Sequence, residues 1–331
     1  MSSSSANRTI TAVAGAGAAV AAATVIGAGV ALVRIALDTT YPKSIFARKR
    51  LDHFADYDDA GDHVSEESRR WFEQTRQPVV IRSYDHLKLH AWRFDPDTAK
   101  PAPHHYAVCV HGYSGDPGEM ATWAQHYAAM GYTVFTPALR AHELSEGRYV
   151  TMGAIESRDV KQWVNFIVSN DPQAKIVLHG NSMGAASVLF AGANPCHAPN
   201  IKAIVSDSAF TAGASQLAHS MADALHVPRA LTRPSIAFAN LLLKRAAAVS
   251  LADADVLAAV RHLTVPTLFI QGDADTIVDP SSARTLYEAC ASNDCELLVV
   301  DGAPHVASLM TDPQLYWSTV DRFLHGVPGL D

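Results

Sequence analysis

The feature that most constrains this chain is a serine flanked by glycines where a strand turns into a helix. Gly180-Asn181-Ser182-Met183-Gly184 follows an apolar run at 175–179, which predicts a buried strand, and opens a run of small residues at 183–191, which predicts a helix. The glycines permit a turn that is too tight for side chains. Such a turn lifts the serine hydroxyl above the sheet edge, at the positive end of the helix dipole. We therefore predict that Ser182 is a nucleophile.

A nucleophilic serine needs a histidine as base and a carboxylate that orients this histidine. In this strand–turn–helix setting they follow the serine in the order acid, then histidine, each in a loop after a later strand. Asp275 follows the expected strand at 267–271, and His305 follows the expected strand at 296–300. We predict Asp275 as the acid and His305 as the base.

The choice of acid leaves alternatives open. Asp273 lies in the same loop as Asp275, and Asp279 is close to it. Asp207 follows the expected strand at 201–206, which is also a suitable place for the acid. All these positions lie at the carboxyl ends of expected parallel strands, where open α/β sheets place their sites.

Two backbone N–H groups are predicted to stabilise the oxyanion that forms during the attack. The first belongs to Met183, directly after the serine. The second belongs to Tyr113 in the loop His111-Gly112-Tyr113-Ser114-Gly115, which follows the apolar run at 106–110. The alternative is that the Tyr113 side chain only lines the pocket. We expect the His111 ring to hold this loop by hydrogen bonds.

The wider pattern predicts an α/β fold, with a mostly parallel central sheet flanked by helices. Short apolar strands alternate with helices from about residue 78 onward. The stretch 211–252 has no clear strand and is rich in Ala, Leu, His and Met, which predicts a helical cap that sets substrate choice. We therefore expect a catalytic domain at 78–328 with its cap at about 211–252.

The N-terminal region predicts a membrane anchor. Residues 9–33 contain no charged side chain, and a helix of that length spans about 37 Å, more than a hydrocarbon core of about 30 Å. We expect an anchor within residues 1–35, and a linker with an amphipathic entry segment at 36–77. A cleaved signal peptide followed by secretion, or an apolar helix of a soluble protein, are the alternatives. Basic residues after the segment favour a cytoplasmic catalytic domain.

These residues resemble a known group, the bacterial serine hydrolases of the α/β-hydrolase superfamily, near its carboxylesterase-like and prolyl-oligopeptidase-like branches. The resemblance covers about residues 78–326 and depends on His111-Gly112-Tyr113, the glycine-flanked Ser182, Asp275-Thr276-Ile277-Val278 and Ala303-Pro304-His305. It implies the α/β-hydrolase fold and a Ser-His-Asp triad. In such proteins the acid usually stands three residues before a Val, which favours Asp275 over Asp273, and several relatives carry an N-terminal membrane segment.

The chain departs from the superfamily pattern at one loop. Where such proteins often have Asp-x-Arg-Gly-His-Gly-x-Ser, this sequence has Ala138-Leu139-Arg140-Ala141-His142-Glu143-Leu144-Ser145. The Arg, His and Ser match, whereas the Asp and both glycines do not. The usual His-Gly before the acid loop is Gln271-Gly272 here. None of these changes removes a predicted catalytic group.

Other function classes find little support. The net charge of −7, without a basic stripe, argues against a nucleic-acid partner. We expect no cofactor or metal, because the sequence has no P-loop, no strand-linked G-x-G-x-x-G and no H-E-x-x-H. Of the four cysteines, Cys290 and Cys295 could form a disulfide in an oxidising compartment.

The sequence therefore predicts hydrolysis of small-molecule carboxylic esters through an acyl-enzyme on Ser182. A peptidase or amidase, and a thioesterase or acyltransferase, would use the same triad. A membrane-tethered binding protein is the non-enzymatic alternative.

Overall fold

The computed structural model describes residues 19–47, 64–194 and 199–330. The first part of the predicted anchor, residues 1–18, lies outside these ranges, as do the basic residues 48–50 and Cys196.

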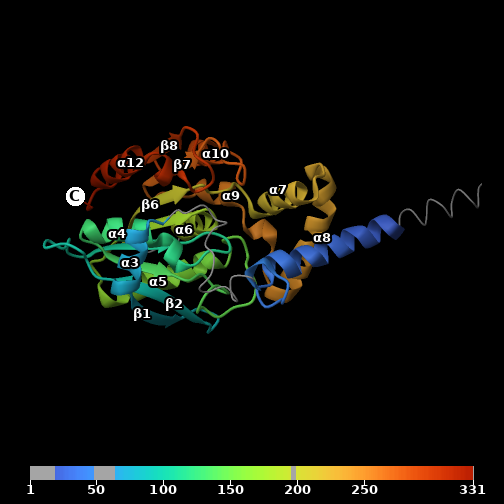
Figure 1. Ribbon diagram of the computed structural model, residues 1–331, viewed down its shortest axis with the longest axis horizontal. Helices are drawn as coiled ribbons and strands as arrows, with labels where there is room; N and C mark the ends of the chain where they lie inside the picture. The colour runs from blue at the N-terminus through green and yellow to red at the C-terminus, as the bar shows by residue number, and fades with distance from the viewer. Residues whose placement is uncertain (1–18, 48–63, 195–198, 331) are drawn as a thin grey trace, which may run out of the picture.

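A single eight-stranded sheet forms the centre of the molecule, as Figure 1 shows. Its strand order is β1-β2-β4-β3-β5-β6-β7-β8. The first two strands run antiparallel to their neighbours, and all later pairs are parallel. The strands are β1 (Gln77–Arg82), β2 (Lys88–Phe94), β3 (His105–Val110), β4 (Thr133–Pro137), β5 (Lys175–Asn181), β6 (Ile201–Asp207), β7 (Thr267–Gly272) and β8 (Cys295–Val300).

The sequence of each strand matches its place in the sheet. Strands β5, β6 and β7 are apolar and buried on both faces, as expected for parallel strands covered by helices on either side. The edge strand β1 instead alternates exposed and half-buried residues over most of its length. The alternation of apolar strands and crossover helices predicts a mostly parallel sheet, and the structure confirms this prediction.

Helices cover both faces of this sheet and create two hydrophobic cores. One core contains Trp123 and Tyr316, and the other contains Trp163 and Leu286. The first face is covered by α3 (Glu66–Thr75), the 3₁₀ turn η2 (Pro117–Met120), α4 (Ala121–Ala129), α11 (Ser308–Thr311) and α12 (Pro313–His325). The second is covered by α5 (Glu156–Asn170), α6 (Met183–Ala193), α9 (Val256–Val260) and α10 (Ser282–Ala289).

A helical insertion lies between β6 and β7, at the predicted cap position. It consists of α7 (Gly213–Leu225), α8 (Arg229–Ala247) and the 3₁₀ turn η3 (Leu251–Asp253). Figure 1 shows α7 and α8 projecting from the end of the sheet domain. Gly213 begins α7 where a Cβ would lie only 2.7 Å from the Cβ of Met152. The insertion therefore packs closely against the loop that precedes α5.

Among the described residues, one helix is long and apolar enough to cross a membrane, Ala19–Leu37, with a mean hydropathy of 2.1. A signal sequence near the N-terminus can meet the same criteria. The helix ends in a π-helical turn, η1 (Val33–Leu37), and runs beside α8 in Figure 1. A Cβ at Gly29 would lie 2.9 Å from the carbonyl oxygen of Ser235 and 2.9 Å from the Phe238 ring. The second half of this helix is therefore packed against the cap.

The stretch predicted as a linker contributes to the folded domain. Leu37 and Phe46 are buried in one core, and Phe72 of α3 is buried in the other. Ser65 caps α3, because its hydroxyl accepts a hydrogen bond from the Ser68 N–H.

The pair Cys290 and Cys295 lies at the end of α10 and the start of β8. Their thiols interact by a hydrogen bond, and both are free cysteines in this structure. The predicted disulfide stays a prediction.

Candidate active site

Ser182 lies in a sharp turn between β5 and α6. Its backbone has φ +53° and ψ −113°, a conformation that residues other than glycine rarely adopt. The two neighbouring glycines explain why the turn can form. A Cβ at Gly180 would lie 2.4 Å from the Gly184 carbonyl, and a Cβ at Gly184 would lie 2.1 Å from the Val110 carbonyl oxygen. The backbone packing around the serine therefore excludes any side chain at these positions.

The structure brings Ser182, His305 and Asp275 together at the carboxyl ends of β5, β8 and β7. His305 Nε2 lies 2.9 Å from the Ser182 hydroxyl oxygen. Its other ring nitrogen, Nδ1, lies 2.7 Å from Asp275 Oδ2. A carboxylate can only accept, so Nδ1 carries the proton and Nε2 is free to accept from the serine. This is the hydrogen-bonded relay that general-base activation of a serine requires.

The Asp275 carboxylate is buried and fully hydrogen-bonded. Its Oδ1 accepts from the backbone N–H groups of Ile277 and Val278 at 2.8 and 2.9 Å. Its Oδ2 accepts from the Gln271 side-chain amide at 2.7 Å as well as from His305. Sequence reasoning notes Gln271 only as a departure from the superfamily pattern and does not identify this contact. These donors fix the carboxylate in one orientation toward the His305 ring.

The alternative acids have other partners. Asp273 accepts from the Gly302 N–H at 2.7 Å, and Asp279 accepts from the Ser281 hydroxyl and N–H. Asp207 is fully buried and bonds to Ser208 and Tyr316. Among the described residues, Asp275 alone pairs with His305.

The predicted oxyanion loop follows β3 and lies against the serine. A Cβ at Gly112 would be 3.4 Å from the Ser182 Cβ, so the loop backbone passes close to the nucleophile. The His111 ring holds the loop as expected. Its Nε2 accepts from the Leu139 N–H at 3.0 Å, so its Nδ1 carries the proton and donates to the Gly112 carbonyl at 2.8 Å.

Both predicted oxyanion donors are near the serine in the chain fold. Met183 is the first residue of α6, where a backbone N–H has no partner within the helix. Tyr113 follows Gly112 in the loop, and among the described residues no backbone–backbone hydrogen bond outside the helices and strands uses its N–H. The arrangement leaves these two groups available for an oxyanion.

A buried hydrogen-bond network lies beneath the site. The Tyr316 hydroxyl donates to Asp207 Oδ2 at 3.1 Å and accepts from the Trp123 indole at 2.9 Å. Its remaining lone pair faces His179 Nε2 at 3.2 Å, so this nitrogen carries the proton. His179 Nδ1 then accepts from the Tyr127 hydroxyl at 3.0 Å. Burial lowers the pKa of His179 to about 3, which keeps the ring neutral.

The same network reaches the loop that carries His305. Asp207 Oδ1 accepts from the Ser208 hydroxyl at 2.8 Å, and this hydroxyl accepts from the Val306 N–H at 3.2 Å. Val306 has a φ of +57°, which is strained for a β-branched residue. Burial raises the pKa of Asp207 to about 6. The network therefore helps to hold the residue after His305 in a conformation that it would not adopt by itself.

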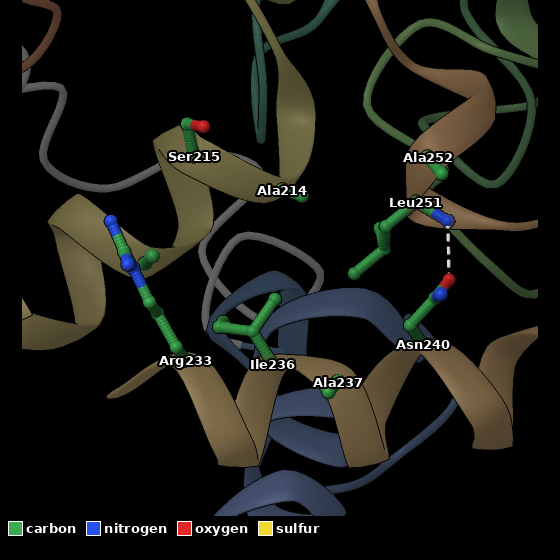
Figure 2. Close-up of a pocket in the computed structure, with 9 residues that line it drawn as sticks. Ala214, Ser215, Arg233, Ile236, Ala237, Asn240, Leu251 and Ala252 are labelled. Atoms are coloured by element: carbon green, nitrogen blue, oxygen red, sulfur yellow. Dashed lines mark hydrogen bonds between the residues drawn. The ribbon is translucent and has the colours of Figure 1, made fainter. Parts of the chain in front are cut away.

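The cap contains a separate cavity of ≈ 280 Å³ between α7, α8 and η3. Ile236, Leu251, Arg233 and Ser215 are among its lining residues, as Figure 2 shows. The Asn240 side chain closes one end by accepting a hydrogen bond from the Leu251 N–H at 2.6 Å. No triad residue lines this cavity.

The fold and the geometry of this site define a serine hydrolase with the α/β-hydrolase fold. The profile of the family described as serine aminopeptidase, S33, matches residues 101–252 and 243–314. The chain belongs to this family.

Similar proteins of known function agree with this class. A thermostable monoacylglycerol lipase of Bacillus sp. (strain H-257) is 27% identical over 220 residues, which cover 62% of this chain and 84% of the lipase. A monoacylglycerol lipase of Mycolicibacterium smegmatis is 27% identical over 251 residues, covering 64% and 85%. An esterase structure from Pyrococcus furiosus has a TM-score of 0.62 and 26% identity, covering 77% of this chain and 92% of the esterase. The predicted fold and the predicted serine hydrolase class are confirmed, and the names of these relatives agree with ester hydrolysis.

Proposed function

We propose that this protein hydrolyses carboxylic esters of the monoacylglycerol type, with Ser182 as nucleophile, His305 as base and Asp275 as the orienting acid. The observation that carries the proposal is the chain of two hydrogen bonds from Ser182 through His305 to Asp275, with distances of 2.9 and 2.7 Å. The monoacylglycerol lipases among the similar proteins support the substrate class.

The first half-reaction forms an acyl-enzyme. His305 Nε2 removes the hydroxyl proton while Ser182 Oγ attacks the ester carbonyl carbon, and the π electrons move to the carbonyl oxygen. The N–H groups of Tyr113 and Met183 stabilise this oxyanion. When the carbonyl re-forms, the bond to the alkoxy oxygen breaks, and His305 donates its proton to the departing alcohol.

The second half-reaction releases the acid. His305 removes a proton from a water molecule that attacks the acyl carbon, and a second oxyanion forms in the same place. Its collapse breaks the bond to Ser182 Oγ, which takes the proton back from His305. Asp275 stabilises the charged imidazole during both steps.

We also propose that the apolar N-terminal helix attaches the enzyme to a membrane, with the catalytic domain at 78–328 and the cap at about 211–252. The length and hydropathy of Ala19–Leu37 support this. Because Gly29, Val33 and Leu37 are buried against α8 and the core, we assign the part of the helix that precedes Gly29 to the membrane.

The experiment compares the full-length protein in detergent with its Ser182→Ala variant. Both are treated with a fluorophosphonate probe and then assayed on p-nitrophenyl esters of rising chain length, on a monoacylglycerol and on an aminoacyl anilide. We expect labelling and ester turnover in the parent only. Wild-type turnover by Ser182→Ala would refute the triad, and preferential cleavage of the anilide would identify an amidase instead.

A further inference from the structure

The carboxyl end of the N-terminal helix is built into the catalytic domain. Leu37 is fully buried, and its carbonyl accepts a hydrogen bond from the Val150 N–H at 2.9 Å. The next residue, Asp38, forms an ion pair with Arg148 at 2.8 Å. The Thr39 N–H then donates to the Arg148 carbonyl at 2.9 Å. The helix end is therefore fixed to the loop between β4 and α5.

The π-helical turn directs one helix carbonyl toward the oxyanion loop. The Asp38 N–H reaches back five residues to the Val33 carbonyl at 2.7 Å, and the Thr40 N–H bonds to the Asp38 side chain at 3.0 Å. The Thr40 amide, which an α-helix would direct to the Ala36 carbonyl, is therefore used elsewhere. The Tyr113 hydroxyl donates to the Ala36 carbonyl instead.

The Tyr113 side chain is held from a second direction by the same N-terminal segment. The Phe46 ring packs edge-on against the Tyr113 ring, with 5.4 Å between centroids. Phe46 also packs edge-on against His142 at 5.4 Å. Burial raises the pKa of Tyr113 well above its usual range, so its hydroxyl remains a donor at any working pH.

The helix that holds Tyr113 is also in contact with the cap. At Gly29 the backbone of the helix lies so close to α8 that a Cβ would be 3.2 Å from the Ala239 nitrogen and 2.9 Å from the Ser235 carbonyl oxygen. One rigid element therefore contacts α8 at Gly29 and the oxyanion loop at Ala36.

We propose that the N-terminal helix is part of the catalytic unit, and that the hydrogen bond from the Tyr113 hydroxyl to the Ala36 carbonyl positions the Tyr113 N–H for the oxyanion. Tyr113 thus has two roles: its backbone stabilises the oxyanion, and its side chain positions that backbone. This inference rests on the proposed function, because the oxyanion role of the Tyr113 N–H belongs to it.

The first test is Tyr113→Phe in the full-length protein, which removes the hydroxyl and keeps the ring. We expect kcat to fall by about 10- to 100-fold with KM little changed, because a displaced donor weakens transition-state binding more than substrate binding. Tyr106→Phe is the matched control. It also removes one tyrosine hydroxyl, which bonds to Asp171 at the opposite end of β3, and it should keep kcat.

A readout that partial unfolding would not change is the affinity for an alkyl boronic acid, which forms a tetrahedral adduct on the serine. In Tyr113→Phe its inhibition constant should rise by the same factor as kcat falls. Endpoint fluorophosphonate labelling counts the folded sites in each preparation. A lower labelled fraction with an unchanged inhibition constant would overturn the inference.

The second test separates the helix from the cap. Gly29→Leu places a side chain against α8, whereas Gly27→Leu places it where no atom lies within 4 Å. We expect Gly29→Leu to lower kcat in the same way as Tyr113→Phe, and Gly27→Leu to keep it. If Ser182→Ala is inactive while Tyr113→Phe and Gly29→Leu both keep parental kcat, the proposed function stands and this inference fails. If Ser182→Ala is active, the proposed function itself fails.

Discussion

At the scale of single residues, the identity of the acid can be tested by a pair of substitutions in one loop. Asp275→Asn keeps the shape of the side chain, but its amide no longer stabilises a charged His305 and favours the wrong tautomer. We expect kcat to fall by about 10⁴-fold, as such a change does in other serine triads. Asp273→Asn is the control, since this exposed carboxylate bonds to the Gly302 N–H and not to His305. Equal losses in both variants would contradict the assignment.

His179 links the stability of the fold to pH. Its pKa of about 3 in the folded protein is below the ordinary value of 6.5. The folded state therefore excludes a proton that the unfolded chain accepts, so the stability that neutral His179 contributes is present above pH 6.5 and is lost as the pH falls. Asp207 acts in the opposite direction, because its pKa is raised to about 6, and its contribution is lost as the pH rises through that value.

Comparison with a His179→Gln variant isolates this effect, because Asp207 is present in both proteins. An amide can still donate to Tyr316 and accept from Tyr127, but it does not titrate. The loss in free energy of unfolding caused by the substitution should be smaller at pH 4 than at pH 7.5, by about 3 kcal/mol. Urea unfolding at both pH values measures it, with His86→Gln at an exposed position as the control. A cost that does not change with pH would contradict a neutral His179.

At the scale of secondary-structure elements, Arg140 ties the loop after β4 to helix α5. Its guanidinium forms two hydrogen bonds of 2.6 and 2.7 Å with Asp159, and both side chains are buried. Two longer hydrogen bonds connect it to Asp85. This pairing holds the loop, although the Asp and the two glycines of the superfamily pattern are absent.

Arg140→Met should reduce the free energy of unfolding by about 3–5 kcal/mol, because it leaves the Asp159 carboxylate buried without its partner. Adding Asp159→Leu should recover most of the loss. Arg322→Met breaks the pair with Glu296, in which both side chains are exposed, and should cost less than about 1 kcal/mol. Denaturant titration of the parent, the two single variants and the double variant measures these free energies of unfolding. A small effect of Arg140→Met would show that the loop is held by other contacts.

Elements with a strong local pattern could be predicted from the sequence. The strands β5, β6 and β7 are short apolar runs, and each ends where the chain must turn. The positions of Ser182, Asp275 and His305 follow from this order, because parallel strands bring their carboxyl ends to one edge. Asp275 is predicted as the acid, but Asp273, Asp279 and Asp207 remain as alternatives, since only the folded loop shows which carboxylate faces the His305 ring.

Contacts between distant segments could not be predicted. Nothing near Gln271 indicates that its amide bonds to Asp275, and nothing near Ala36 indicates that its carbonyl accepts from Tyr113. The N-terminal helix has no polar face. Its sequence pattern therefore predicts contact with lipid and does not predict packing against α8. The only local clue is Gly29, since small residues allow close helix packing.

At the scale of the whole molecule, the docked helix limits how the protein can sit at a membrane. Residues 19–28, the described part of the helix that precedes Gly29, rise about 15 Å as a helix. In the remaining turns, Gly29, Val33 and Leu37 contact α8 and the core, whereas Ile35 is exposed. The proposed anchor therefore brings the cap close to the lipid surface.

Lysines in the free part of the helix test this arrangement. Val20 and Ile26 are exposed, and each change to Lys should cost about 3 kcal/mol of membrane insertion. We expect the double variant to leave the membrane fraction in flotation assays while it keeps activity on water-soluble esters. Leu144→Lys, at an exposed site in the loop after β4, should stay in that fraction. Retention of the Val20→Lys/Ile26→Lys protein would argue against this anchor.

The docked helix also sets an order of events during synthesis. It leaves the ribosome well before its partners: Tyr113 follows Ala36 by 77 residues, Arg148 follows Asp38 by 110, and α8 emerges later still. Until then the helix has no protein surface to cover it and is open to the machinery that delivers apolar segments to lipid. Under the proposed anchoring, delivery comes before completion of the oxyanion loop. Anchoring and assembly of the active site are thereby coupled through one helix.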